Sequence, residues 1–206
     1  MGRPRSDIAP RLVHAARRRF LEDGVDGASL RQIAREAGTN LGMLYYYFPT
    51  KDELFLAVVE EVYAGLLRDL RKALDPERPF EDRLRGVYAR IGALSDDEFT
   101  VMRLVAREAM VSSQRLGRVL ARFKEGHIGD VLQTLAEGYQ TGRVREEISP
   151  AALLPCMAGL AFGLILARRV ADAAREGNAE PPWLPAEPAE VAKTAADLLL
   201  RGIAAR

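Results

Sequence analysis

Apolar residues recur at helical spacing along almost the whole chain, and no stretch sustains the strict apolar and polar alternation of a half-buried strand. Capping residues, glycines and prolines divide this pattern into nine predicted helices, with no internal repeat or low-complexity tract. Their approximate ranges are 7–24, 29–38, 39–48, 51–74, 80–94, 95–110, 116–141, 150–175 and 189–203. The sequence therefore predicts an all-α fold.

The region around residues 29–50 carries unusually clear helix-start signals. Ser29 opens a Ser-x-x-Gln capping box, and Thr50 is followed at the same spacing by a glutamate. Between these two starts, Thr39 or Asn40 can cap a helix of about two turns. A helix so short is stable only when its neighbours hold it. Two short helices separated by a glycine turn are the layout of a helix-turn-helix.

The short third helix is strongly aromatic. Leu44 and Phe48 share one face by their i,i+4 spacing, whereas Tyr45, Tyr46 and Tyr47 fan around the rest of the circumference. Three consecutive residues of a helix cannot all point inward, so at least one tyrosine is exposed and available to a partner. Packing in the core is the competing interpretation, with nearly equal weight for Tyr45.

Charge is distributed unevenly although the formal net charge is only +1. Residues 1–52 hold nine Lys or Arg against six acids, and the rest of the chain has a slight acidic excess. A basic N-terminal part favours a nucleic acid or an anionic surface as partner. Residues 1–5 form a basic arm that either lies in solvent or follows a phosphate backbone. The arginines at 17–19 are more typical of a solvated face.

Other features exclude several classes of protein. A single cysteine, Cys156, rules out an internal disulfide framework, and its apolar neighbours suggest a buried thiol. Without a secretory signal, the expected location is the cytoplasm. The apolar run 151–167 is short for a membrane span and is interrupted by proline and glycines, so a buried or interface helix is expected and no membrane. Residues 177–188 are proline-rich and predict a surface loop anchored by Trp183.

An enzyme is not expected. Only two histidines are present, and the chain has no zinc-protease motif, glycine-rich phosphate loop or nucleophile elbow. Glu125, His127 and Asp130 are close in sequence, but residues two apart on a helix do not face each other, so no metal site or cofactor is predicted. A helical interaction module without DNA binding would leave the exposed tyrosines unexplained.

The stretch SLRQIAREAGTNLGMLYYYFPTKDEL resembles the DNA-binding signature of the TetR (tetracycline repressor) family of transcriptional regulators. The resemblance implies a nine-helix fold with a helix-turn-helix DNA-binding domain over residues 1–50 and a ligand-binding and dimerisation domain over residues 51–206. It further implies a homodimer on a palindromic double-stranded operator, released by a small hydrophobic effector. Repression is the commoner outcome in the family.

Site roles carried over from the family depend on position in the motif. Side chains expected at base edges or phosphates are Ser29, Arg31, Thr39, Asn40, Leu41, Gly42, Tyr45, Tyr46, Tyr47 and Lys51. Asn40, Leu41, Gly42 and Tyr46 are the base candidates, since an asparagine can pair with adenine and an apolar side chain can touch a thymine methyl. Ser29 is a structural cap first. Leu41 and Met43 depart from the small or polar residues usual around this glycine, so the base preference stays open.

Effector and dimer residues are predicted on the later helices. The candidate effector lining is Tyr88, Arg103, Arg107, Met110, Phe123, His127 and Tyr139, for which ordinary core packing is the alternative. The candidate dimer interface is Gly159, Leu160, Gly163, Leu164, Ala167, Leu198 and Leu199. Small residues there let a partner helix approach closely, and an internal core helix is the alternative.

Overall fold

The computed structural model describes residues 7–177 and 187–204, and these residues are helical throughout apart from turns and one isolated bridge. Ten helices are present in the described part of the chain: α1 (Ile8–Gly27), α2 (Leu30–Glu36), α3 (Leu41–Tyr47), α4 (Lys51–Ala73), α5 (Phe80–Gly92), α6 (Asp96–Val111), α7 (Ser113–Lys124), α8 (His127–Gln140), α9 (Pro150–Glu176) and α10 (Pro188–Ile203). The all-α prediction is confirmed. The basic arm over residues 1–5 and Trp183 lie outside the described residues.

The predicted count of nine helices is wrong because the helix expected over 116–141 is two helices. Gly126 has φ −110° and ψ −130°, which ends α7 and begins α8. A side chain at Gly129 would put its Cβ 2.7 Å from the carbonyl oxygen of Lys124, so only glycine fits this junction. The apolar spacing continues across the break, which is why periodicity alone joins the two helices.

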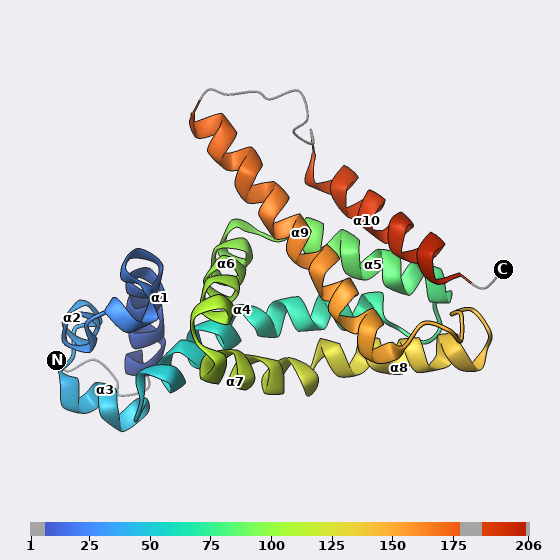
Figure 1. Ribbon diagram of the computed structural model, residues 1–206. Coiled ribbons are helices and arrows are strands. Elements are labelled where there is room, and N and C mark those ends of the chain that lie inside the picture. The colour runs from blue at the N-terminus through green and yellow to red at the C-terminus, as the bar shows by residue number, and fades with distance from the viewer. Residues whose placement is uncertain (1–6, 178–186, 205–206) are drawn as a thin grey trace. The chain divides into compact units, whose positions relative to one another are not determined.

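The chain folds as two compact units. Unit 1 comprises residues 1–65 and 96–121, and unit 2 comprises residues 66–95 and 122–206. In unit 1, α1, α2 and α3 pack on one another (Figure 1). Phe20 of α1 meets Phe55 of α4 edge to face, with ring centroids 6.4 Å apart, and both rings are fully buried. Unit 1 therefore joins the predicted helix-turn-helix to a segment that lies far from it in sequence.

Unit 2 is built around α5, which packs along α10 and also contacts α9 (Figure 1). Gly92 makes the close approach to α10 possible, since a Cβ there would lie 2.7 Å from the Cβ of Ala192. The buried Arg83 of α5 binds Glu137 of α8 through two hydrogen bonds of 2.7 and 2.6 Å. Buried charges are stable only when paired in this way.

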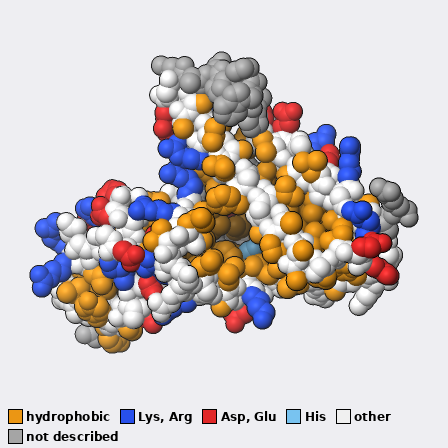
Figure 2. All heavy atoms as spheres, in the orientation of Figure 1, with side chains coloured by type: hydrophobic (Ala, Val, Ile, Leu, Met, Phe, Trp, Pro, Cys, Tyr) orange, Lys and Arg blue, Asp and Glu red, His pale blue; other side chains and the backbone are white. Residues whose placement is uncertain are grey.

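Helix α9 leaves most of its apolar surface uncovered. Among the described residues it is the one helix long and apolar enough to cross a membrane by length and composition, and 17% of its most apolar window is buried. Hydrophobic side chains gather over α9 and α10 on the face of unit 2 seen in Figure 2. Cys156 lies on this helix and is exposed, so the expectation of a buried thiol is wrong. A helix that is apolar on every side gives no pattern that separates its inner face from its outer one.

Candidate DNA interface

Helices α2 and α3 form a capped pair around a glycine turn. The Ser29 hydroxyl accepts from the amide of Gln32 at 3.4 Å and begins α2, as predicted. Gly38 then adopts φ +67°, a left-handed conformation that favours glycine. Asn40 caps α3, with its Oδ1 accepting from the Met43 amide at 2.9 Å. These contacts establish the helix-turn-helix geometry expected from the sequence.

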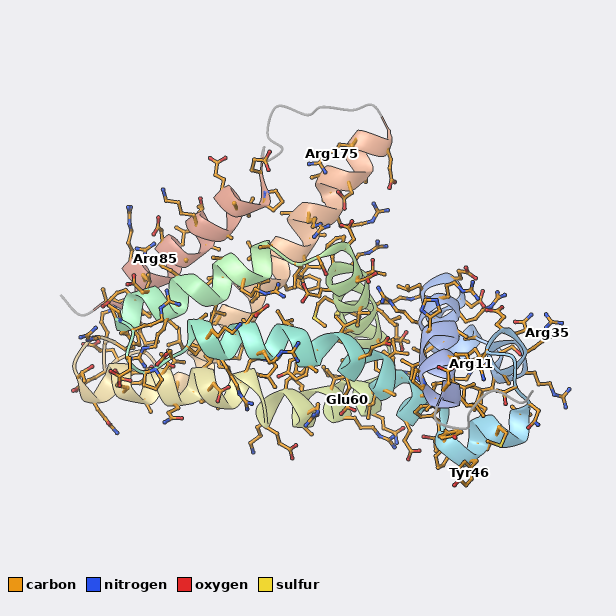
Figure 3. All side chains as sticks on the ribbon, turned by 180° about the vertical axis from the view of Figure 1, so that it is seen from behind. Arg11, Arg35, Tyr46, Glu60, Arg85 and Arg175 are labelled. Carbon is orange, nitrogen blue, oxygen red and sulfur yellow. The ribbon has the colours of Figure 1, made fainter. Side chains whose placement is uncertain are left out.

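The tyrosines of α3 face outward. Tyr45 and Tyr46 are exposed, with Tyr46 at 76% of its surface, and Tyr47 is half-buried. The rings of Tyr46 and Tyr47 meet edge to face at 5.2 Å. Figure 3 shows Tyr46 projecting from α3 away from the other helices of unit 1. Leu44 fills the inner face instead, so packing in the core does not account for Tyr45 or Tyr46.

Asn40 has only part of its amide free for a base. Its oxygen caps α3, which leaves the two N–H donors of the side chain. Pairing with adenine uses both the oxygen and the nitrogen, so it requires breaking the cap. Glycine at position 42 leaves room for the Asn40 cap, because a Cβ there would lie 3.3 Å from the same oxygen.

Lys51 is held by the protein itself. Its Nζ donates to the carbonyl oxygens of Asp26 and Ala28, each at 2.9 Å, where α1 ends and α2 is about to begin. A cation is stabilised at the carbonyl end of a helix. One of its three N–H donors remains for a phosphate.

The other predicted DNA residues lie on α2, on α3 or in the turn between them. Arg31 and Gly42 are exposed, whereas Thr39 and Leu41 are half-buried. Arg35 also stands out from α2 into solvent, although the sequence did not single it out (Figure 3). Solvent exposure of a basic side chain on α2 is the signal that could have found it.

The arginines at 17–19 make ion pairs that fix the position of α1. Arg18 and Arg19 both bind Glu36 of α2, and Arg17 binds Asp97 of α6 at 2.5 Å. The guanidinium of Arg19 holds the pKa of Glu36 below its ordinary value. These pairs set α2 against α1, so the interpretation as a merely solvated face is incomplete.

A buried arginine that the sequence did not indicate lies behind this region. Arg115 of α7 is 6% exposed and binds Asp26, at the end of α1, through hydrogen bonds of 2.9 and 2.7 Å. It also contacts Asp52 at 3.4 Å and faces Glu108 at 2.9 Å. No local pattern predicts pairs this far apart in the sequence.

The seven effector candidates divide between the two units. Those in unit 1 are Arg103, Arg107 and Met110, and those in unit 2 are Tyr88, Phe123, His127 and Tyr139. Met110 is 86% exposed. A cavity of about 420 Å³ in unit 1 is lined by α1, α2 and α4 residues such as Arg11, His14 and Glu61, and by none of the seven.

Several effector candidates already have partners within the fold. The Tyr88 hydroxyl donates to the carbonyl of Met157 at 3.0 Å, and burial raises its pKa. The Tyr139 hydroxyl donates to the carbonyl of Ile148 at 2.5 Å. The Arg103 guanidinium lies 5.7 Å from the centre of the Phe99 ring. These contacts need no ligand to explain them.

The candidate dimer residues lie on α9 and α10 of unit 2. Leu164 and Leu199 are buried within the chain, whereas Gly159 is exposed and Leu198 is 62% exposed. Leu160, Gly163 and Ala167 are half-buried. A side chain at Gly159 or Gly163 would meet nothing within 4 Å, so these glycines do not serve packing inside one chain.

Comparison with known proteins finds a family of regulatory proteins that matches the part of the chain containing α2 and α3. Residues 12–58 match the family described as "Bacterial regulatory proteins, tetR family". The chain is 27% identical over 177 residues to the HTH-type transcriptional regulator UidR of Escherichia coli, covering 82% of this chain and 85% of that protein. It is 25% identical over 178 residues to the HTH-type transcriptional repressor DhaR of a Mycobacterium species, covering 86% and 87%.

A solved structure with the same fold is that of the transcriptional regulator FadR from Bacillus subtilis in complex with stearoyl-CoA. The TM-score is 0.72 at 18% identity, with 94% of this chain and 98% of that chain covered. At this identity the likeness concerns the fold. It shows that the two chains share an all-α fold.

Proposed function

The chain belongs to the tetR family of bacterial regulatory proteins, and from this membership we propose that it is a ligand-responsive repressor that binds a palindromic operator as a homodimer. As a member it is a DNA-binding transcriptional regulator of the helix-turn-helix type. The observation that carries the proposal is the coincidence of two features. The matched segment, residues 12–58, contains the capped pair α2 and α3, and α3 presents Tyr46 to solvent.

Helix α3 enters the major groove in this proposal, with its N-terminal residues nearest the base edges. The Tyr46 hydroxyl, the Asn40 amide and the side chain of Leu41 are the groups proposed to read bases, with the Gly42 backbone close to them. Ser29, Arg31, Tyr45, Tyr47 and Lys51 contact phosphates and set the register of the protein on the duplex. Thr39 lies just before the N-terminal end of α3 and is also proposed to contact the DNA.

The homodimer is supported by the uncovered apolar surface of α9 and α10. Leu198, Phe162 and Leu166 are exposed there, and exposed apolar patches mark interaction sites in soluble proteins. A second copy of the chain would cover them about a two-fold axis. The dimer would then present two reading heads, each the α2–α3 pair of one copy, about 34 Å apart. A single head makes too few contacts for a typical operator affinity of about 10⁻⁸ to 10⁻¹¹ M.

Release by a small hydrophobic effector is the regulatory part of the proposal. The FadR structure holds stearoyl-CoA, which makes acyl-CoA the first chemistry to test. The effector domain is proposed over residues 51–206 and the DNA-binding domain over residues 1–50. An effector shifts the population only if it binds the released state and the DNA-bound state with different affinity. The protein would act in the cytoplasm, where it meets bacterial DNA.

Selection of bound fragments from the source genome tests the proposal directly. The expected result is a small set of fragments that share an inverted repeat, bound by one dimer per repeat and weakly by a half-site. Acyl-CoAs of increasing chain length are then titrated against the complex, with Tyr46→Ala as the variant deficient in DNA reading. Recovery of random fragments would contradict operator recognition, and no release by any acyl chain would contradict this class of effector.

A further inference from the structure

Arg115 is the most buried cation among the described residues of unit 1, and three carboxylates surround it. Its guanidinium forms a bidentate pair with Asp26, a longer contact with Asp52 and an ion pair with the buried Glu108. The Glu108 pair is close, but its atoms lack hydrogen-bond alignment. A buried ion of this kind is destabilising when one partner is removed, because the charge left behind is uncompensated.

The two aspartates mark the two ends of the helix-turn-helix. Asp26 lies at the end of α1, just before α2, and Asp52 lies in the first turn of α4, just after α3. Lys51, the neighbour of Asp52, donates to the carbonyls of Asp26 and Ala28. Arg115 and Lys51 therefore join the chain segments that enter and leave the α2–α3 pair.

Helix α6 contacts α1 at two further places in unit 1. Asp97 of α6 binds Arg17. The guanidinium of Arg107 occupies the space over Gly24, where a Cβ would meet its Nη2 at 2.6 Å and where φ is +75°. Gly24 is the kink in α1 and lies two residues before Asp26. The segment 96–121 thus sets both the kink and the end of α1.

We propose that Arg115 is a positioning residue for the DNA-reading helix, acting through Asp26 and Asp52 to hold the ends of α1 and α4 at the separation that α2 and α3 require. The proposal rests on the proposed DNA-binding function. Arg115 forms its ion pairs with residues of α1, α4 and α6, so its effect is on the geometry of α2 and α3 rather than on contacts with DNA. A movement of the turn between α6 and α7 would be transmitted to α2 and α3 through this side chain.

Four proteins test the proposal: wild type, Arg115→Met, Asp26→Asn and the double variant. Met keeps the apolar stem and removes the charge, and Asp26 has an exposed side chain, so its change is tolerated by the fold. The matched control is Arg83→Met, which removes an equally buried arginine with a bidentate carboxylate partner in unit 2. Measurements are operator affinity by fluorescence anisotropy and hydrogen exchange of the amides over residues 28–50.

Arg115→Met is expected to weaken operator binding about tenfold and to speed exchange over residues 28–50, with similar changes for Asp26→Asn. The double variant should bind no more weakly than the weaker single variant, because either single change already removes the pair between Arg115 and Asp26. Arg83→Met should leave both readings unchanged. Affinity and exchange equal to wild type in Asp26→Asn, or additive losses in the double variant, would overturn the proposal.

The exchange measurement needs no DNA, so it separates this inference from the proposed function. If the wild-type protein selects no operator but Asp26→Asn still speeds exchange over residues 28–50, the positioning role stands and DNA recognition fails. If Arg115→Met does not fold, Asp26→Asn and Asp52→Asn give the same two readings.

Discussion

Tyr46 is the most exposed aromatic side chain of α3, and the fold gives it no packing role. Tyr46→Ala should lower operator affinity and flatten the base preference, by about 1–3 kcal/mol if the hydroxyl reads a base. The free energy of unfolding should change by less than about 0.5 kcal/mol, because the side chain is a surface one. Anisotropy titrations on the operator and on single-base variants measure both effects.

Tyr46→Phe is the control for this prediction, since it removes only the hydroxyl. Loss of discrimination in the phenylalanine variant would assign the reading to the hydroxyl, and retention would assign it to the ring. Unchanged affinity and preference in Tyr46→Ala would rule out Tyr46 as a base contact.

Asn40 combines a capping oxygen with a free amide, and substitutions can separate the two roles. Asn40→Ser keeps a cap of similar strength and removes the amide, so stability should hold while discrimination at one base pair of each half-site falls. Asn40→Ala should in addition lose about 1 kcal/mol of stability with the cap. Chemical denaturation and binding to operator variants report the two quantities. Wild-type discrimination in Asn40→Ser would mean that the side chain only caps α3.

Lys51 has contacts within the protein that use most of its charged group, because two of its three N–H donors already bind carbonyl oxygens. Lys51→Met should lower the free energy of unfolding by about 1–3 kcal/mol through the loss of these charged hydrogen bonds. If the third donor reaches a phosphate, the variant should also weaken binding to all sequences alike. The slope of log affinity against log salt should then fall by about one unit for each reading head. Equal salt slopes for variant and wild type would leave Lys51 with the structural role alone.

At the scale of elements, the joint between α7 and α8 carries a titratable group. The rings of Phe123 and His127 lie 5.0 Å apart across the turn at Gly126. Burial lowers the pKa of His127 from 6.5 to about 4, against the smaller opposing effect of the Asp130 carboxylate. The folded protein therefore keeps this imidazole neutral at pH values where the unfolded chain binds a proton.

The sign of the pH dependence follows from this difference. The contribution of neutral His127 is fully present above about pH 6.5 and is lost as pH falls toward about 4, at no more than about 1.4 kcal/mol per pH unit. Carboxylates with lowered pKa values, such as Glu36 and Glu137, lose their contribution only at lower pH. Denaturation of wild type and His127→Gln between pH 7 and 5 should show a steeper decline in the wild type. An equal decline in the free energy of unfolding with falling pH in both proteins would contradict the lowered pKa of His127.

Elements were predictable from the sequence where a local signal fixed them. The caps at Ser29, Asn40 and Thr50 lie where the sequence puts them, because a side-chain oxygen and an amide three residues away are enough to begin a helix. The break at Gly126 was missed, since the apolar pattern keeps its phase across the junction. A single glycine inside a helical pattern does not by itself indicate a break.

Features that depend on tertiary contacts were not predictable. The buried Arg115 is 89 residues from Asp26 and 63 from Asp52, and its sequence neighbours do not distinguish it from surface arginines. Likewise the exposure of Cys156 depends on which side of α9 other helices cover. The motif over residues 29–53 predicted the α2–α3 pair, whereas the buried Arg115 lies in a part of the chain without a motif.

At the scale of the whole molecule, the uncovered face of α9 and α10 is the surface that the proposed homodimer would bury. Exposed apolar patches mark interaction sites in soluble proteins, and the described part of the chain buries only 17% of the most apolar window of α9. In the proposed homodimer a second copy of the chain would cover this face and would also supply the second copy of α3 for a palindromic operator. We therefore expect substitutions that prevent oligomerisation to weaken operator binding as well.

The double substitution Phe162→Glu with Leu198→Glu tests this coupling, because both side chains are exposed in one chain and would be buried against a partner. Four glutamates in a two-fold interface would be desolvated and would repel one another, so the variant should sediment as a monomer at micromolar concentration. Leu132→Glu on α8 is the control, as a change of the same kind at an exposed leucine outside α9 and α10.

Operator affinity of the monomeric variant should fall about 10²-fold or more, to the level of a half-site, because the two heads no longer bind as one unit. Its helical content and the exchange of amides in α2 and α3 should match those of wild type. A monomeric variant that binds the full operator as tightly as wild type would show that the reading head acts alone. A wild-type protein that is itself monomeric at micromolar concentration would place the partner of α9 and α10 outside this chain.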